Sequence, residues 1–348
     1  MKRETTFLIG GVIAVILLFV LFFSILSASE KRSSRELRLG FFPNIQHSQA
    51  LVGLSKNFFQ KELGEDMNIS TKVFNAGPSV IEAMFAGELD IAYIGPNPSI
   101  NGFTKSNGTA LRVIAGATSG GAAFVVRDDS GIRAASDLKG KKFASPQLGN
   151  TQDVALRFYL KKNGLETVEN GGDVQVIPTQ NPDILSLFLK KEIDGAWVPE
   201  PWATRLVQEG GGVVLVDERD LWPDGKFVTA NIIVSTKFLR ERPDVVKKFL
   251  KAHVETTQWI NANKAEAIKI TNERIKELTG KALPQKVIED AFTHLEVTYD
   301  PVKNSLFESA NAAFELGFLG KTKPDLTGIY DLTLLNEVLQ EKGLAQIN

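Results

Sequence analysis

Short apolar runs alternate with longer amphipathic runs along most of the chain, beginning at residue 37. The runs LRLGFF, ISTKVF and DIAYIG are typical of buried strands, whereas SQALVGLSKNFFQKEL and PSVIEAMFAGEL have the spacing of amphipathic helices. Strands that alternate with helices of this length are usually joined by crossovers, which favour parallel pairing. The pattern therefore predicts an α/β fold with a largely parallel sheet.

The first residues depart from this pattern. Residues 7–28, FLIGGVIAVILLFVLFFSILSA, contain no charged residue and follow Lys2 and Arg3. The run exceeds the roughly 7–15 apolar residues of a secretory signal and matches the roughly 20 of a membrane-spanning helix. We therefore favour an uncleaved membrane anchor over a signal peptide cleaved near Ala28, with residues 1–36 comprising this helix and a tether. Either alternative places the rest of the chain outside the cytoplasm.

A second pattern is an internal repeat. The segment PSVIEAMFAGELDIAYIGPNP, beginning at Pro78, aligns with PDILSLFLKKEIDGAWVPEPW, beginning at Pro182. In this alignment Asp90 is paired with Asp194. Each copy contains a proline at a helix start, an apolar helix, an acidic turn, a strand and a proline-rich loop. The repeat predicts two similar lobes whose strand-end loops face each other across one cleft.

The segments after the first copy complete this plan. AAFVVRDD and TANIIVST have the composition of strands that carry the chain between the lobes, and helical runs follow the second of them. We therefore expect residues 37–121 to begin the first lobe and residues 122–230 to form the second. Residues 231–348 would then complete the first lobe and add C-terminal helices.

Composition narrows the range of functions. Lys and Arg number 40 and Asp and Glu 41, so the net charge is −1 with no clustered basic face, which argues against nucleic acid as a partner. The absence of Cys excludes disulfides, thiolate metal ligands, a Cys nucleophile and a lipid-modified Cys. The chain contains three His, which argues against a His-rich metal centre. The G-x-S-x-G, phosphate-loop, dinucleotide-binding and H-E-x-x-H motifs are missing. We therefore expect no cofactor, no metal and no catalysis.

Three junctions between a strand and a helix are rich in small and polar residues, namely PNIQHSQ, YIGPNPS and SPQLGNTQ. A helix start has unpaired backbone N–H groups and the positive end of the helix dipole, so it favours an anion. Three such starts would hold a monovalent anion without Lys or Arg, with Asn150 or Thr151 capping the last helix. The candidate binding residues here are Asn44, Gln46, His47, Ser48, Gly95, Pro96, Asn97, Gln147, Gly149, Asn150 and Thr151.

Two further segments contribute candidates. In WVPEPWATR, Trp197 and Trp202 flank Glu200, which suits a ligand with an apolar part. The alternative is that both Trp side chains pack the lobe and that Glu200 caps the next helix. Ser119 precedes a Gly–Gly pair that serves either as a hinge or as a source of N–H donors. His47 is either a donor to the ligand or a structural residue.

Together these segments resemble a known family. LRLGFFPNIQHSQALVGL, FNAGPSVIEAMFAGELDIAYIGPNPSI, DLKGKKFASPQLGNTQDVALRFYL and EIDGAWVPEPWA are similar, in this order, to the periplasmic substrate-binding proteins of ABC importers. The branch that they resemble serves nitrate, taurine and aliphatic sulfonates, and is similar to binders of thiamine-pyrimidine precursors. The resemblance implies a two-lobed, type II-like periplasmic-binding-protein fold that closes on its ligand and delivers it to a membrane permease with its ATPase.

The binding positions of this family fall within residues 44–48, 95–97, 147–151 and 197–202 of the chain. The resemblance therefore implies a monomeric, extracytoplasmic receptor for a small anion, with an aliphatic sulfonate as the expected ligand and nitrate or taurine as alternatives. A neutral pyrimidine stacked on Trp197 or Trp202 would keep the fold and change the ligand. A membrane-anchored enzyme that uses His47 as acid and base is the alternative from a different class.

Overall fold

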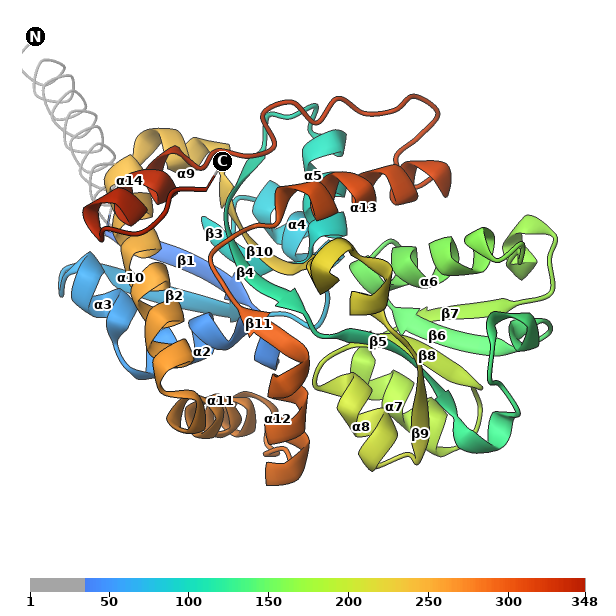
Figure 1. The fold of residues 1–348 in the computed structure, drawn as a ribbon. Coiled ribbons are helices and arrows are strands. Elements are labelled where there is room, and N and C mark those ends of the chain that lie inside the picture. The colour runs from blue at the N-terminus through green and yellow to red at the C-terminus, as the bar shows by residue number, and fades with distance from the viewer. Residues whose placement is uncertain (1–34, 348) are drawn as a thin grey trace, which may run out of the picture.

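The computed structural model describes residues 35–347, so the membrane anchor expected at residues 7–28 lies outside the described residues. Within residues 35–347, no helix combines the length and the apolar character that crossing a bilayer requires. This part of the chain forms two β-sheets, each flanked by helices (Figure 1). We call the six-stranded sheet with its helices the first lobe, and the five-stranded sheet with its helices the second lobe.

The first lobe is built on a mixed sheet with the strand order β11-β4-β10-β3-β1-β2. Strand β1 pairs in parallel with β2 and β3, whereas β10 runs antiparallel to β3 and β4, and β11 runs antiparallel to β4. Alternate side chains point to opposite faces, so Tyr93 joins one hydrophobic core and Ile94 joins the other. The strands are β1 (Glu36–Phe41), β2 (Asn68–Val73), β3 (Ile91–Ile94), β4 (Leu111–Gly120), β10 (Val228–Ser235) and β11 (Leu295–Val297).

Helices cover both faces of this sheet, which explains why its strands are apolar throughout rather than alternating. Helices α2, α3, α10 and α14 contribute to the core that contains Tyr93, and α4, α5 and α13 contribute to the core that contains Ile94. The helices are η1 (Ile45–His47), α2 (Ser48–Ser55), α3 (Phe58–Leu63), α4 (Gly77–Phe85), α5 (Pro96–Lys105), α9 (Thr236–Glu241), α10 (Pro243–Ala262), α11 (Lys264–Thr279), α12 (Gln285–Ala291), η7 (Phe292–His294), α13 (Lys303–Glu315) and α14 (Thr333–Glu341).

The second lobe has a five-stranded sheet with the order β7-β6-β8-β5-β9. Strand β6 pairs in parallel with β7 and β8, and β5 runs antiparallel to β8 and β9. Its strands are β5 (Ala122–Arg127), β6 (Lys142–Pro146), β7 (Gln175–Thr179), β8 (Gly195–Pro199) and β9 (Gly212–Asp217). Its α-helices are α6 (Thr151–Lys162), α7 (Asn181–Leu189) and α8 (Trp202–Gln208).

The repeat seen in the sequence is present in the backbone. The parallel unit β2-β1-β3 of the first lobe corresponds to β7-β6-β8 of the second. The carboxylate of Asp90 accepts a hydrogen bond from the backbone N–H of Arg38 at 2.8 Å, and the carboxylate of Asp194 accepts one from Lys142 at 2.9 Å. Each carboxylate therefore ties the turn before one strand to the neighbouring parallel strand, at the same place in both copies.

The chain passes between the lobes twice, and these passages make both sheets mixed instead of largely parallel. Strand β4 ends at Gly120, and β5 begins in the other sheet after Gly121; both glycines have positive φ angles, 75° and 76°. Residues 218–227 then lead from β9 back to β10. Strands β5 and β10 each enter a sheet at the carboxyl ends of its parallel strands, so each must run antiparallel to them.

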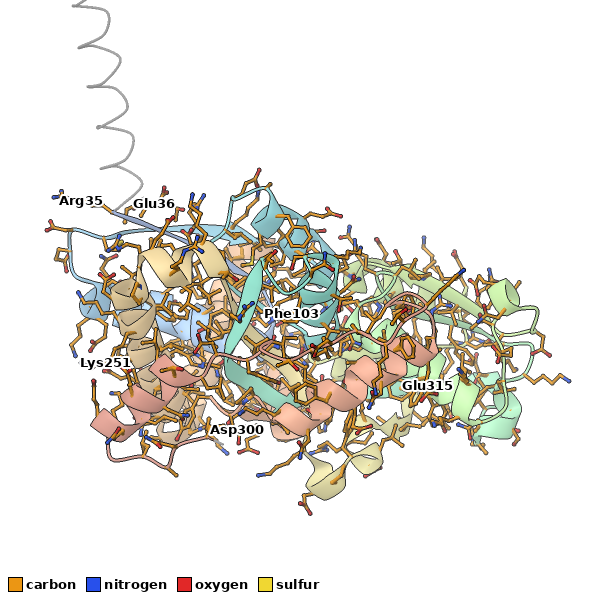
Figure 2. The ribbon with its side chains drawn as sticks, turned by 90° about the horizontal axis from the view of Figure 1, so that it is seen from above. Arg35, Glu36, Phe103, Lys251, Asp300 and Glu315 are labelled. Carbon is orange, nitrogen blue, oxygen red and sulfur yellow. The ribbon has the colours of Figure 1, made fainter. Side chains whose placement is uncertain are left out.

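The lobes also contact each other away from these passages. Helix α13 of the first lobe extends across to α6 of the second (Figure 1). Lys161 on α6 donates a hydrogen bond to the backbone carbonyl of Glu315 at 2.8 Å. Figure 2 shows Glu315 at the end of α13, beside the second lobe. The structure is therefore one in which the two lobes lie against each other.

Candidate functional site

The carboxyl ends of the parallel strands in the two sheets face each other, which is where ligands bind in open α/β sheets. Asn75, just after β2, donates a hydrogen bond to the side chain of Gln180, just after β7, at 3.1 Å. Gly95, just after β3, approaches Thr151 at the start of α6. Strand-end loops of the two lobes are thus brought together across one cleft.

At the helix starts that follow β1, β3, β6 and β7, five buried side-chain oxygens have no hydrogen-bond partner among residues 35–347. Each belongs to a residue in the first turn of a helix or just before it, and the side chains come from both lobes. We call these residues the helix-end cluster: Asn44, Ser48, Asn97, Thr151 and Asn181. A buried polar group without a partner costs roughly 1–3 kcal/mol, so several at helix starts on the facing edges of the two sheets indicate a site prepared for a ligand.

A chain of contacts links the three helix starts that the sequence singled out. The hydroxyl of Thr118 donates to the backbone carbonyl of Gln46 in η1 at 2.7 Å, and the hydroxyl of Thr229 donates to the carbonyl of Thr118 at 3.2 Å. The carbonyl of Thr229 in turn lies 3.6 Å from the position that a methyl group on Gly95 would occupy. The same methyl group would lie 2.5 Å from Oγ1 of Thr151. The starts of η1, α5 and α6 therefore surround one region.

The loop before α6 is held by a buried carboxylate rather than by the expected cap. Asp153 accepts hydrogen bonds from the Ser145 hydroxyl at 2.6 Å, the Gly149 backbone N–H at 2.9 Å and the Arg157 guanidinium at 3.1 Å. Within residues 35–347, the side chain of Asn150 makes no capping hydrogen bond to α6, which corrects the expectation from the sequence. Asp153 instead braces the loop that precedes the helix, because its carboxylate can accept several donors at once.

The same loop has a constrained backbone. Gln147 and Gly149 both lie in the left-handed region, with φ angles of 38° and 73°. The Gln147 side chain ends in a buried amide oxygen that finds no partner in the described part of the chain. The turn aims the first residue of α6, Thr151, at Gly95 and the first lobe.

Three of the predicted binding residues have polar groups that are used inside the protein. His47 accepts a hydrogen bond from the Phe42 backbone N–H through Nδ1 at 2.9 Å, and burial lowers the pKa of His47 to about 3, so its ring is neutral. Gln46 donates to the carbonyl of Gly121 at 2.7 Å, and the hydroxyl of Ser119 accepts from the Phe227 N–H at 3.3 Å. Gln46 and Ser119 therefore brace the passages between the lobes.

Trp197 does not join the helix-end cluster. Its ring is fully buried in the core of the second lobe, stacks on Phe124 with a centroid distance of 5.4 Å, and donates to Glu218 at 2.7 Å. Its counterpart in the repeat, Tyr93, is a fully buried core residue as well and bonds to His253. Position in the repeat therefore indicates a packing role for both aromatic residues.

Glu200 is buried and forms two kinds of hydrogen bond. Its carboxylate accepts from the backbone N–H of Thr204 at 3.1 Å and from the Thr204 hydroxyl at 3.0 Å, so Glu200 holds the start of α8. The same carboxylate lies 2.6 Å from His294 in the first lobe. A carboxylate with these partners is neutralised by the protein, which removes the repulsion that a free Glu200 would exert on an anion.

A pocket of about 300 Å³ opens beside the helix-end cluster, between the lobes. Asn44 and Asn181 of that cluster form part of its wall, and Trp202 contributes from the second lobe. Of the two Trp residues expected near the ligand, Trp202 is thus the one that reaches a cavity. We call this cavity the side pocket.

Comparison with known proteins adds to this geometry. The model of the NMT1-like family matches residues 30–275, which is more than half of the chain. The chain belongs to the NMT1-like family. The matched range includes all the strands that frame the cleft except β11, together with the helix-end cluster.

Individual relatives of this NMT1-like protein are binding proteins. A protein of Brucella abortus, named simply as a binding protein, is 31% identical over 211 residues, which are 60% of this chain and 63% of that protein. A Bacillus subtilis protein, provisionally named for binding aliphatic sulfonates, is 26% identical over 320 residues, 90% of this chain and 91% of that protein. The resemblance to the sulfonate, taurine and nitrate branch is thereby confirmed.

A solved structure supports the fold of the NMT1-like protein. The alkanesulfonate-binding protein of Xanthomonas axonopodis pv. citri, solved bound to MOPS, superposes with a TM-score of 0.71 at 19% identity. The match covers 85% of this chain and 98% of that chain. The two-sheet periplasmic-binding-protein fold expected from the sequence is therefore confirmed for this chain.

Two residues at the cleft were missed in the sequence, for different reasons. Asn181 directly precedes Pro182, which the repeat pairs with Pro78, so the repeat contained a signal for it. His294 follows α12 far from every quoted motif, and nothing in its local sequence points to Glu200. Within residues 35–347, no three His, Asp or Glu side chains lie close enough together to hold a metal ion.

Proposed function

We propose that this protein is the extracytoplasmic solute-binding component of an ABC importer, and that it captures a small anion, an aliphatic sulfonate in the first instance. The observation that carries the proposal is the helix-end cluster, whose buried hydroxyl and amide oxygens come from both lobes and lack partners among residues 35–347. The names of its relatives support a sulfonate over other anions. The ligand would be bound and released unchanged.

The physical basis is the replacement of water around the anion. A sulfonate that leaves water loses strong hydrogen bonds, and it binds only where protein donors take their place. The Ser48 and Thr151 hydroxyls can donate, and the amide of an Asn can turn its NH₂ group toward an anion. The first turns of α2 and α6 add backbone N–H groups and the positive ends of two helix dipoles.

Closure would couple binding to transport. The donors lie on both lobes, so a ligand stabilises the arrangement in which the lobes touch only because it contacts both. Gly120 and Gly121, with their positive φ angles, lie in one of the two passages that would bend. We further propose that residues 7–28 anchor the protein outside the cytoplasm and that the closed form docks on a permease.

Calorimetry on the full chain in detergent tests the proposal. The ligands are ethanesulfonate, taurine, nitrate and a neutral aminopyrimidine, in Tris chloride because many common buffers are themselves sulfonates. We expect ethanesulfonate to bind, and we expect Thr151→Ala to weaken its binding about tenfold or more, the loss typical of a hydrogen bond to a charged group. Thr109→Ala, which alters an exposed hydroxyl far from the cleft, serves as the matched control and should bind as the wild type.

Three outcomes would contradict the proposal. If none of the anions binds, or if Thr151→Ala binds ethanesulfonate as tightly as the wild type, the helix-end cluster is not the anion site. Binding of the aminopyrimidine alone would support the neutral ligand instead. A change in the mass of the bound ligand after incubation would identify an enzyme.

A further inference from the structure

The side pocket has a polar inner end and an open mouth. Asn44 and Asn181 are buried, each 7% exposed, and each has an amide oxygen without a partner among the described residues. Lys281 and Pro284, which also line the pocket, are exposed to solvent. A ligand would therefore enter past Lys281 and reach the helix-end cluster through Asn44 and Asn181.

The walls between these ends are aromatic and aliphatic. Phe42 and Phe74 come from the first lobe, Trp202 from the second, and Ile275 and Leu283 from the end of α11 and the loop after it. Such a surface favours apolar groups and gives a small hydrated ion nothing to bind. The pocket volume of about 300 Å³ is roughly twice that of a cavity that accepts benzene, about 150 Å³.

Charge in the side pocket favours an anion over a cation. The Arg205 guanidinium lies 4.7 Å from the centre of the Trp202 ring, and the carboxylate of Glu209 holds it at 2.6 and 3.1 Å. Glu209 is the single carboxylate among the described residues that line the pocket, and it is thus already neutralised. Since Arg205 and Glu209 offset each other, Lys281 at the mouth leaves the pocket lining with a net positive charge. An ammonium group on the ligand would find here apolar walls, the cation of Lys281, and a single carboxylate that Arg205 already holds.

We propose that the side pocket binds the apolar body of an elongated organic anion, with the amides of Asn44 and Asn181 turned so that their NH₂ groups donate to the anionic group, and with an aromatic or bulky group against Trp202. The inference rests on the proposed function and narrows its ligand class to sulfonates that carry an aromatic or bulky apolar group. Nitrate would leave the pocket unfilled, and the ammonium group of taurine would meet apolar walls and a lining of net positive charge. Trp202 and Arg205 are accordingly specificity residues.

Calorimetry with matched sulfonates tests this inference. Benzenesulfonate and methanesulfonate share the anionic group and differ in the body, so the ratio of their dissociation constants reports on the side pocket. We expect benzenesulfonate to bind at least about tenfold more tightly than methanesulfonate, because the ring buries apolar area that a methyl group cannot. In Trp202→Ala the two ligands should bind about equally, and Trp202→Phe should retain part of the preference.

The controls separate this inference from the proposal on which it rests. Phe307→Ala, which removes an exposed aromatic side chain on α13, should leave the ratio unchanged. Equal binding of the two sulfonates by the wild type would overturn the inference about the side pocket and leave the anion site standing. Failure of both sulfonates to bind would overturn both. If folded Trp202→Ala keeps the wild-type ratio of the two dissociation constants, the benzene ring of the ligand does not bind against Trp202, and the inference is wrong.

Discussion

The imidazole Nδ1 of His294 lies 2.6 Å from Oε1 of Glu200, and this contact joins the first lobe to the second. The bond to Glu200 raises the pKa of His294, and Asp290 adds to the effect, whereas burial and the nearby Arg219 lower it. The positive charge of His294 also contributes to lowering the pKa of Asp217. A protonated His294 is therefore favoured when the lobes are in contact.

The first prediction concerns the pH dependence of this contact. The pKa of His294 is raised in the folded protein. The stabilising effect of its contact with Glu200 is therefore fully present below about pH 6.5 and is lost as the pH rises through the raised pKa. We expect His294→Gln to lower the melting temperature at acidic pH, and the difference from the wild type to shrink as the pH increases. Differential scanning calorimetry across about pH 5–8, where histidine titrates, measures this.

Asn75→Ala provides the control for that series. It removes the hydrogen bond between Asn75 and Gln180, which also joins the lobes but involves no titrating group. Its effect on the melting temperature should be independent of pH over the same range. Parallel curves for His294→Gln and the wild type would show that the pair does not stabilise the contact between lobes.

The second prediction concerns Glu218, in the segment that returns the chain to the first lobe. Burial raises the pKa of this carboxyl to about 7, although Trp197 and Trp222 donate hydrogen bonds to it. Stability is therefore greatest with Glu218 protonated, below about pH 4.5, and falls as the pH rises through 7. Glu218→Gln should be more stable than the wild type by a margin that grows over this range toward roughly 3 kcal/mol.

Urea unfolding of both proteins at matched pH values measures this margin, because other titrating groups are common to the two and cancel. The Gln side chain can still accept from the Trp197 indole through its amide oxygen. A constant difference between the variant and the wild type from pH 4.5 to 7 would place the carboxyl in a solvated environment, contrary to its buried position.

Much of the fold could be predicted from the sequence because its signals are local. The periods of strands and helices, and the copy of Asp90 at Asp194, each depend on a few neighbouring residues. The direction of β5 and β10 could not be predicted in this way, since it depends on the side from which the chain enters each sheet. A largely parallel sheet was therefore expected where both sheets are mixed.

The same distinction, between local sequence signals and contacts that depend on tertiary structure, applies to the residues of the candidate site. Ser48, Asn97 and Thr151 could be identified because the helix starts after parallel strands meet at one edge of a sheet. Trp197 and Trp202 could not be distinguished, since Trp197 lies on a strand and faces either the core or the cleft according to its register, whereas Trp202 begins α8. The contact between Glu200 and His294 depends on tertiary structure alone.

The third prediction separates the roles of the two Trp residues. Trp197 is fully buried between Phe124 and Tyr159, so Trp197→Ala should cost about 3–5 kcal/mol of unfolding free energy. The molecules that remain folded should still bind ethanesulfonate as the wild type does. Urea unfolding and calorimetry measure the two effects. Loss of binding without loss of stability would place Trp197 in the ligand site.

The last prediction concerns Gly95, whose backbone approaches Thr151 of the other lobe. Gly95 has a φ of −71°, which any residue adopts, so Ala is compatible with the backbone there. Its methyl group, however, would lie 2.5 Å from Oγ1 of Thr151. Gly95→Ala should therefore leave each lobe folded but hold the lobes apart, which small-angle X-ray scattering would record as a larger radius of gyration, and it should weaken ethanesulfonate binding about tenfold or more.

A double-mutant cycle shows whether the clash with Thr151 is the cause. The atom of Thr151 next nearest to the added methyl group is Cβ, at 3.6 Å, an ordinary contact distance, so Thr151→Ala removes the clash. The substitution at Gly95 should then weaken binding strongly when residue 151 is Thr and little when it is Ala. If Gly95→Ala weakens ethanesulfonate binding equally in both backgrounds, closure does not bring these residues together, and Gly95 acts on the ligand by another route.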